Sequence, residues 1–206
     1  QSEEGPVYPT PTIGMVGVLE DYKNQMTLDF INAGNVIMLI GKSTDDIACS
    51  EYLKEIHNIT LSPAPHFDLN DEFALQQTIK ELIRNQLIYS AHDVSEGGLF
   101  TTLLESAMVN NLGFEIETDA TIRKDAFLFG EGQSRVVVST SSEKAFVIEN
   151  ICKVLDATQV AGSTFCNTCQ ACFFIVEAIF HIARVYKTFK HTRRTSVIFW
   201  HNKNIF

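Results

Sequence analysis

The 206-residue sequence predicts an α+β domain in which helices cover a mixed β-sheet. Apolar residues make up 45% of the chain and charged residues 20%, which is the composition of a folded globular protein. Short apolar runs that suit strands alternate with longer segments whose apolar side chains recur at helical spacing. Such alternation is typical of a sheet whose faces are covered by helices.

The chain is expected to divide into three parts. The prolines within residues 1–12 keep this segment extended, because each fixes its own φ and disfavours helix at the preceding residue; it is predicted to be an N-terminal linker. Residues 13–156 carry the strand and helix patterns and form the predicted domain. Residues 157–206 form a tail of different composition.

The first elements follow from apolar runs and their flanking polar residues. Residues 13–19 offer a short apolar strand interrupted by glycines. The unbroken apolar run at residues 36–40 predicts a strand buried on both faces. Asp45 or Asp46 is expected to cap a helix that runs to about Ile56.

The middle of the domain is predicted to contain two helices. Asn70 or Asp71 starts the first, and its apolar stripe consists of Leu75, Ile79, Leu82 and Ile83. A strand at residues 87–90 comes next. The second helix follows residue 98, and its apolar face consists of Phe100, Leu104 and Met108, with Gly113 as the stop.

The last part of the domain is predicted to hold two strands and a helix. Apolar and acidic residues alternate over residues 114–118, which suits a half-buried strand, and residues 135–138 form a buried strand. Thr140 and Glu143 have capping-box spacing for a helix that ends near Asp156.

The segment from Ser90 to Leu99 is the first candidate site. His92 and Asp93 lie where a strand ends, so their side chains can reach a cleft or a metal-bound phosphate. Ser95, Gly97 and Gly98 occupy the first turn of the following helix, where unpaired N–H groups and the helix dipole favour an anion. Alternatively, the serine only caps the helix, the glycines allow close packing, and the histidine is hydrogen-bonded in the core.

The segment from Gly130 to Arg135 is the second candidate site. Two glycines flank Glu131, and Gln133 follows, just before a buried strand. This arrangement can present the carboxylate and the amide to a ligand. A glycine bulge with solvated polar residues is the alternative.

Four segments occur in a fixed order: residues 8–17 (YPTPTIGMVG), 50–53 (SEYL), 90–99 and 130–135. Together they resemble the synthetase subunit of the phosphoribosylformylglycinamidine synthase family, in the C-terminal domain of its second half. The resemblance runs over residues 1–139 and implies the α+β fold of the aminoimidazole ribonucleotide synthetase superfamily.

The resemblance implies a ligase of purine biosynthesis. Such an enzyme uses ATP and Mg²⁺ to phosphorylate the amide oxygen of formylglycinamide ribonucleotide, and ammonia from a glutaminase partner then displaces the phosphate. The ATP-binding domains lie upstream in the family, so this chain is expected to be an inactive fragment without a catalytic residue, and its metal ligands are unknown.

The resemblance assigns the candidate residues to a companion nucleotide or phosphate site. These residues are His92, Asp93, Ser95, Gly97, Gly98, Glu131 and Gln133. Two alternatives stay open: a domain of a related ATP-dependent synthetase, and a non-catalytic scaffolding domain. Cys49 stands where the family usually has a glycine, and it is expected to be a buried thiol.

Charge and hydropathy argue against two classes of partner. The formal net charge of −9 disfavours nucleic acid. The most apolar stretch, residues 172–182, is too short and too polar to cross a bilayer. With no signal peptide visible and an odd number of cysteines, the chain is expected to be cytoplasmic.

The tail differs from the rest of the chain. Residues 161–206 carry six basic residues and one acidic residue, whereas the first 160 residues carry 10 basic and 24 acidic ones. Three interpretations stay open: an amphipathic helix over residues 170–189, an out-of-frame or chimaeric sequence, and a soft-metal site. The ligands of such a site would be Cys166, Cys169, Cys172 and His181.

Overall fold

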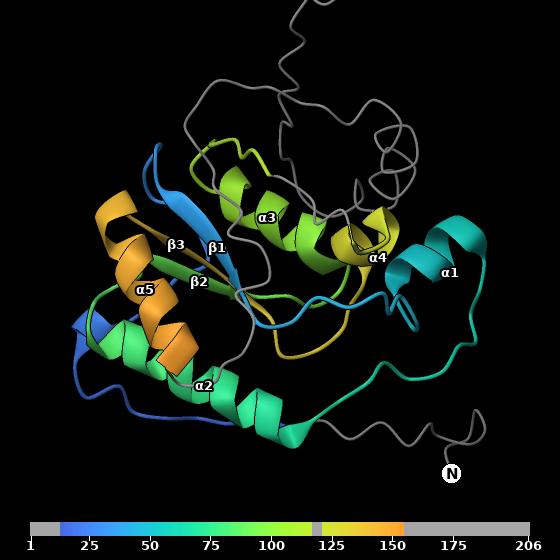
Figure 1. Ribbon diagram of the computed structural model, residues 1–206, viewed down its shortest axis with the longest axis horizontal. Coiled ribbons are helices and arrows are strands. Elements are labelled where there is room, and N and C mark those ends of the chain that lie inside the picture. Colours follow the sequence, from blue (N-terminus) through green and yellow to red (C-terminus); the bar gives the residue numbers. More distant parts are fainter. Residues whose placement is uncertain (1–12, 117–120, 155–206) are drawn as a thin grey trace, which may run out of the picture.

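The computed structural model describes residues 13–116 and 121–154 (Figure 1). In chain order the elements are η1 (Tyr22–Asn24), β1 (Val36–Ile40), α1 (Glu51–His57), α2 (Leu69–Arg84), β2 (Ser90–Asp93), α3 (Gly98–Met108), α4 (Lys124–Phe129), β3 (Val136–Thr140) and α5 (Ser142–Val154). The predictions for the linker and for the tail fall outside the described residues.

The described strands form one three-stranded sheet in the order β1-β3-β2. Val138 in the central strand lies opposite Met38 of β1 and Ala91 of β2, and both pairings are antiparallel. The α+β class is confirmed. A mixed sheet was expected, but every described pairing is antiparallel because both outer strands pair only with β3, which runs against them.

Helices cover both faces of the sheet (Figure 1). Successive side chains of a strand point to opposite faces, so the core has two clusters. On one face the main buried residues are Ile37, Leu39 and Val137 with Phe100, Leu103 and Phe127 from α3 and α4. On the other they are Val36, Met38, Ile40 and Val138 with Leu75 and Leu82 from α2 and Ile148 and Cys152 from α5. The prediction that β1 is buried on both faces is confirmed.

Three other expected strands differ from the structure. Residues 13–19 form no strand, and their apolar side chains lie exposed without a neighbouring strand. The strand expected at residues 87–90 is β2, which begins only at Ser90, because the Leu87 N–H still binds the Leu82 carbonyl at the end of α2. Residues 114–116 form no strand, and Thr118 lies outside the described residues.

Helix α1 begins later than predicted. Its cap is Ser50, whose hydroxyl accepts a hydrogen bond from the Leu53 N–H at 3.3 Å. Asp46 instead stabilises the preceding loop, because its two carboxylate oxygens accept from the N–H groups of Ala48 and His66. The predicted cap at Asp45 or Asp46 is therefore wrong.

Helices α2, α3 and α5 were predicted and lie where they were expected, with shifts in their caps or buried faces, whereas α4 was not predicted. Asp68 caps α2, and the predicted apolar stripe does face the core. In α3 the buried face centres on Leu99, Leu103 and Ala107, so Met108 is partly exposed. Before α5, Thr140 belongs to β3, and the Ser141 hydroxyl accepts from the Lys144 N–H.

Cys49 is exposed, so the expectation of a buried thiol is wrong. Its backbone has φ +55°, in the left-handed region that glycine adopts most easily. The loop at residues 62–63 lies against it, with the Sγ atom 3.2 Å from the Ser62 carbonyl oxygen and 3.1 Å from that of Pro63.

Candidate functional site

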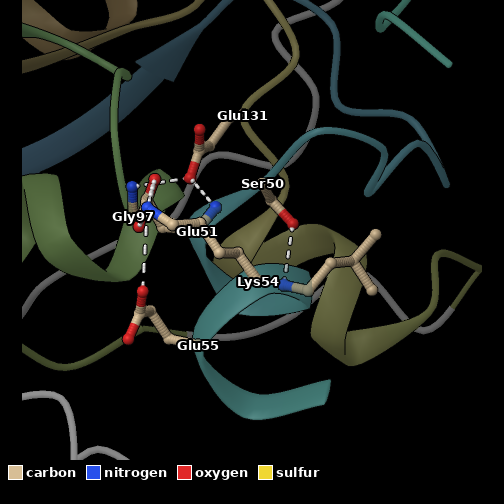
Figure 2. A network of polar contacts seen from close by, with 7 residues as sticks. Ser50, Glu51, Lys54, Glu55, Gly97 and Glu131 are labelled. Carbon is tan, nitrogen blue, oxygen red and sulfur yellow. Dashed lines mark hydrogen bonds and ion pairs between the residues drawn. The ribbon is translucent and has the colours of Figure 1, made fainter. Parts of the chain in front are cut away.

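Three sequence motifs meet at the carboxylate of Glu131, as Figure 2 shows. One of its oxygens, Oε1, accepts a hydrogen bond from the Glu51 N–H at 2.7 Å and another from the Gly97 N–H at 2.8 Å. Glu51 opens α1, Gly97 precedes α3, and Glu131 lies in the loop between α4 and β3. A single oxygen atom therefore joins segments that lie far apart in the sequence.

Both donors belong to helix N-termini, where the first N–H groups have no partner within the helix. Ser50 supplies a side-chain cap for α1, whereas Gly97 supplies none for α3. Glu131 provides the missing acceptor, and its negative charge suits the positive end of a helix dipole.

Burial raises the pKa of the Glu131 carboxyl, and the hydrogen bonds from Glu51 and Gly97 oppose this effect. The negative charges of Glu51 and Glu96 raise the pKa further. On α1 the Glu51 carboxylate also binds Lys54 at 3.1 Å (Figure 2). The site thus holds a half-buried carboxylate in a locally acidic environment.

Gly97 and Gly98 allow the backbone to make this approach. They have φ +82° and φ +70°, which side chains of L residues rarely adopt. A Cβ on Gly98 would lie 2.7 Å from the backbone of Phe129 and 2.8 Å from the Gly130 carbonyl oxygen. The turn before α3 and the loop after α4 are therefore in direct backbone contact.

Arg135 contacts the loop that carries Glu131. Its side chain is buried, Nη2 donates to the Gly130 carbonyl at 2.7 Å, and Nε donates to the Gly132 carbonyl at 3.0 Å. Desolvation lowers the pKa of the guanidinium to about 10, so it remains protonated at neutral pH. Within residues 13–116 and 121–154 it forms no ion pair with a carboxylate.

Asp93 and Ser95 lie together at the end of β2, and both are exposed. The Ser95 hydroxyl donates to an Asp93 carboxylate oxygen, and the Ser95 carbonyl accepts from the Gly98 N–H at 3.0 Å. The serine side chain therefore does not cap α3. The Gly97 and Gly98 N–H groups, expected to be unpaired, already have acceptors in Glu131 and Ser95.

His92 and Gln133 are separate from the Glu131 contacts. The His92 ring is mostly buried, with Nδ1 3.1 Å from the Ser106 hydroxyl and Nε2 3.5 Å from Glu105. The Gln133 side chain is exposed. The structure thus brings Gly97, Gly98 and Glu131 together and pairs Asp93 with Ser95, whereas His92 and Gln133 take no part in these contacts.

Sequence reasoning missed two contributors to this site. One is the N–H group of Glu51 in the SEYL segment, for which the sequence indicates no role. The other is Arg135, at the end of the second motif. Only the arginine offered a signal, because a charged residue directly before a buried strand needs hydrogen-bond partners.

The described residues do not provide a metal-binding cluster. No group of three or more His, Cys, Asp or Glu side chains gathers within residues 13–116 and 121–154 in a way that could hold an ion. In the same part of the chain, no helix has the length and apolar character needed to cross a membrane.

Comparison with protein families gives a match to AIR synthase related protein, C-terminal domain, over residues 32–163. The phosphoribosylformylglycinamidine synthase subunit PurL of Alkaliphilus metalliredigens is 40% identical over 143 residues, 69% of this chain and 19% of that protein. The Salinibacter ruber subunit is 43% identical over 155 residues, 71% of this chain and 20% of that protein. The chain thus spans about a fifth of the length of these relatives.

Solved structures share the fold. Thermotoga maritima PurL complexed with ATP has a TM-score of 0.55 at 20% identity, over 71% of this chain and 23% of that one. The same protein complexed with FGAR has a TM-score of 0.55 at 22% identity, over 64% of this chain and 24% of that one.

Proposed function

Because this chain belongs to the family of AIR synthase related protein C-terminal domains, we propose that it is part of a phosphoribosylformylglycinamidine synthase. The whole enzyme would convert formylglycinamide ribonucleotide to formylglycinamidine ribonucleotide, using ATP and ammonia derived from glutamine. This chain would contribute one α+β domain to that ligase and would be inactive alone.

The observation that carries the proposal is the convergence of three motifs at one carboxylate. Glu51, Gly97 and Glu131 lie within residues 32–163, which match the AIR synthase related C-terminal domain, and the fold places their atoms within hydrogen-bond distance. The contact holds α1, the turn before α3 and the loop after α4 in one arrangement, and this arrangement would shape the face that the domain presents to the rest of the enzyme.

We infer that the turn before α3 borders a nucleotide or phosphate site in the whole enzyme. Asp93, Ser95 and Gln133 are exposed and can reach a ligand, whereas Gly97, Gly98 and Glu131 set the shape of the turn. His92, mostly buried, supports the end of the strand from behind through Ser106. In this role the domain binds and orients, and the reacting groups come from other domains.

The residues fit the two implied cofactors differently. Mg²⁺ lacks a ligand cluster within the described residues, so the domain itself is not proposed to hold the ion. ATP phosphates would meet the Glu131 carboxylate at the Gly97 N–H, so we do not place them on that donor. Beside exposed Ser95 they would need a cation brought with the nucleotide, because the Ser95 hydroxyl is bound to the Asp93 carboxylate. ATP chemistry would be supplied by the preceding domains.

The whole enzyme would have partners and work in one compartment. The partners are the ATP-binding domains of the same enzyme and a glutaminase subunit or domain that supplies ammonia. The compartment is the cytoplasm, and the two free cysteines among the described residues, Cys49 and Cys152, fit its reducing conditions.

The test uses the full-length enzyme that contains this chain. Asp93→Asn combined with Ser95→Ala is expected to weaken ATP binding or the ATP-dependent formation of the amidine, because both exposed polar groups would be altered. Gln77→Ala, at an exposed position on α2, is the matched control. If the double variant equals the parent in ATP affinity and in rate, the nucleotide-facing role is refuted.

A scaffolding role is the second candidate, and one observation favours it. The donors at the start of α3 are already satisfied by Glu131 and Ser95, so the turn is complete without a ligand. Isothermal titration of ATP with Mg²⁺ against the chain, alone and joined to its preceding domain, separates the two roles. A scaffold does not bind nucleotide alone and leaves the ATP affinity of the preceding domain unchanged when joined to it. A nucleotide-facing domain raises that affinity, so the preceding domain alone is the control.

A further inference from the structure

Glu131 has a long side chain on a loop with glycine on each side. Glycine leaves the backbone many conformations, and a free glutamate has several rotatable bonds. Yet one oxygen of this side chain must reach two N–H groups, on Glu51 and Gly97, at 2.7 and 2.8 Å. Something must restrict the loop for both bonds to persist.

We propose that Arg135 is the positioning residue for the Glu131 carboxylate. The guanidinium binds the carbonyl groups of Gly130 and Gly132, the two residues that flank Glu131. The flat, forked geometry of arginine lets one side chain hold two acceptors at once, which a lysine ammonium cannot do with the same rigidity. The loop is thereby held on both sides of the carboxylate.

The energetics of Arg135 argue that this role is specific. A buried guanidinium without a carboxylate partner is costly, because it loses its hydration and gains only backbone dipoles. An apolar residue would fill the same space at lower cost. The retained charge is explained if the two carbonyl contacts are needed to shape the loop.

The consequence of this positioning is a link between α1 and α3. Helix α1 has no buried residue, so its attachment depends on contacts at its N-terminus and on the stacking of Tyr52 against Phe129. Arg135 therefore acts through Glu131 on α1, because its side-chain hydrogen bonds within the described residues go to the Gly130 and Gly132 carbonyls and not to α1 or α3. Only the suggestion that the turn before α3 serves a nucleotide site rests on the proposed function. The link between Arg135 and α1 does not, so its test needs no nucleotide.

The test measures amide hydrogen exchange in the full 206-residue chain. Arg135→Gln is expected to lower the protection of the Glu51 and Gly97 N–H groups by about tenfold, the usual effect of losing a hydrogen bond. Protection of the Val138 N–H in the central strand should stay as in the parent. Ser134→Ala is the matched control, because it removes the bond to Glu72 in the same loop and keeps both carbonyl contacts.

A double variant shows whether Arg135 acts through Glu131. Glu131→Ala alone should remove protection at both N–H groups, and adding Arg135→Gln should lower it no further. Unchanged protection in Arg135→Gln, or an additional loss in the double variant, would overturn the proposal. If these exchange results are as expected but the enzyme with Asp93→Asn and Ser95→Ala equals its parent in ATP affinity and in rate, the proposed function alone is refuted.

A second measurement applies if the glutamine variant fails to fold. In the parent chain the Arg135 Nε–H should exchange slowly and should become exposed together with the Glu51 and Gly97 N–H groups as urea is added. Arg135→Lys keeps the charge but not the fork, and it should show the same selective loss. If the Arg135 Nε–H became exposed at a different urea concentration from the Glu51 and Gly97 N–H groups, the proposal would be contradicted.

Discussion

Ser90 and Ser139 lie directly opposite each other in β2 and β3, and their hydroxyl oxygens are 2.6 Å apart. Both side chains are buried, so neither can replace this bond with water. Removing one hydroxyl should leave the other without a partner, which costs about 1–3 kcal/mol of unfolding free energy.

The Ser90–Ser139 pair predicts non-additive stability changes. Ser90→Ala and Ser139→Ala should each destabilise the domain, and the double variant should be more stable than the sum of the two losses implies. Urea denaturation of the three variants measures this. Strictly additive losses would show that the two hydroxyls do not depend on each other.

Tyr52 stacks on Phe129 with ring centroids 4.9 Å apart and an interplanar angle of 4°. Tyr52→Ala should lower the unfolding free energy by roughly 1–3 kcal/mol, because the stack and its buried area are lost. Tyr52→Phe keeps the ring and is the control. Urea denaturation checks the first effect, and a phenylalanine variant as unstable as the alanine variant would assign the loss to the hydroxyl.

Cys49 predicts a stabilising substitution. Its φ of +55° is strained for a side chain, so Cys49→Gly should raise the unfolding free energy by about 1 kcal/mol. Asn58 has a similar φ of +57°, but asparagine tolerates this region, so Asn58→Gly should gain less. Thermal denaturation of both variants tests this ranking, which equal gains would contradict.

Gly98 predicts the opposite result. With φ +70°, Gly98→Ala would bring a Cβ to 2.7 Å from the Phe129 backbone, which cannot move without shifting α4. The expected loss is about 3 kcal/mol or more, from backbone strain and overlap together. Gly113→Ala is the control, since nothing lies within 4 Å of its Cβ, and it should change stability by less than about 0.5 kcal/mol.

The sequence was most informative where one local signal decided the structure. The apolar run of β1 and the stripe of α2 required no knowledge of distant residues, and both predictions are confirmed. The helix caps were harder to predict, because Asp46 and Ser50 are both residue types that cap helices well. Asp46 binds the His66 N–H in a distant loop, and Ser50 caps α1 instead.

The site could be predicted only in outline. The two glycine-rich motifs were identified, but the contact between Glu51 and Glu131 joins residues that are 80 positions apart. Periodicity and spacing carry no information about such a pair. The strand expected at residues 13–19 failed for a related reason, because β propensity does not supply a neighbouring strand.

The raised pKa of Glu131 predicts how stability varies with pH. A carboxyl whose pKa is higher in the folded state binds more protons there than in the unfolded chain, so its contribution to stability falls as pH rises from its unfolded value of 4.5 through the raised folded value. Glu131→Gln removes this dependence. The stability of the parent relative to this variant should therefore decrease with rising pH across that window.

This comparison must be made as a difference between parent and variant. Asp29, Asp68 and Asp125 have lowered pKa values and act in the opposite sense, since their contribution is lost as pH falls. They are present in both proteins and cancel. Urea denaturation at several pH values above 4.5 measures the difference. A parent that instead gains stability over the variant with rising pH would show that the two N–H donors outweigh burial, and that the Glu131 pKa lies below its ordinary value.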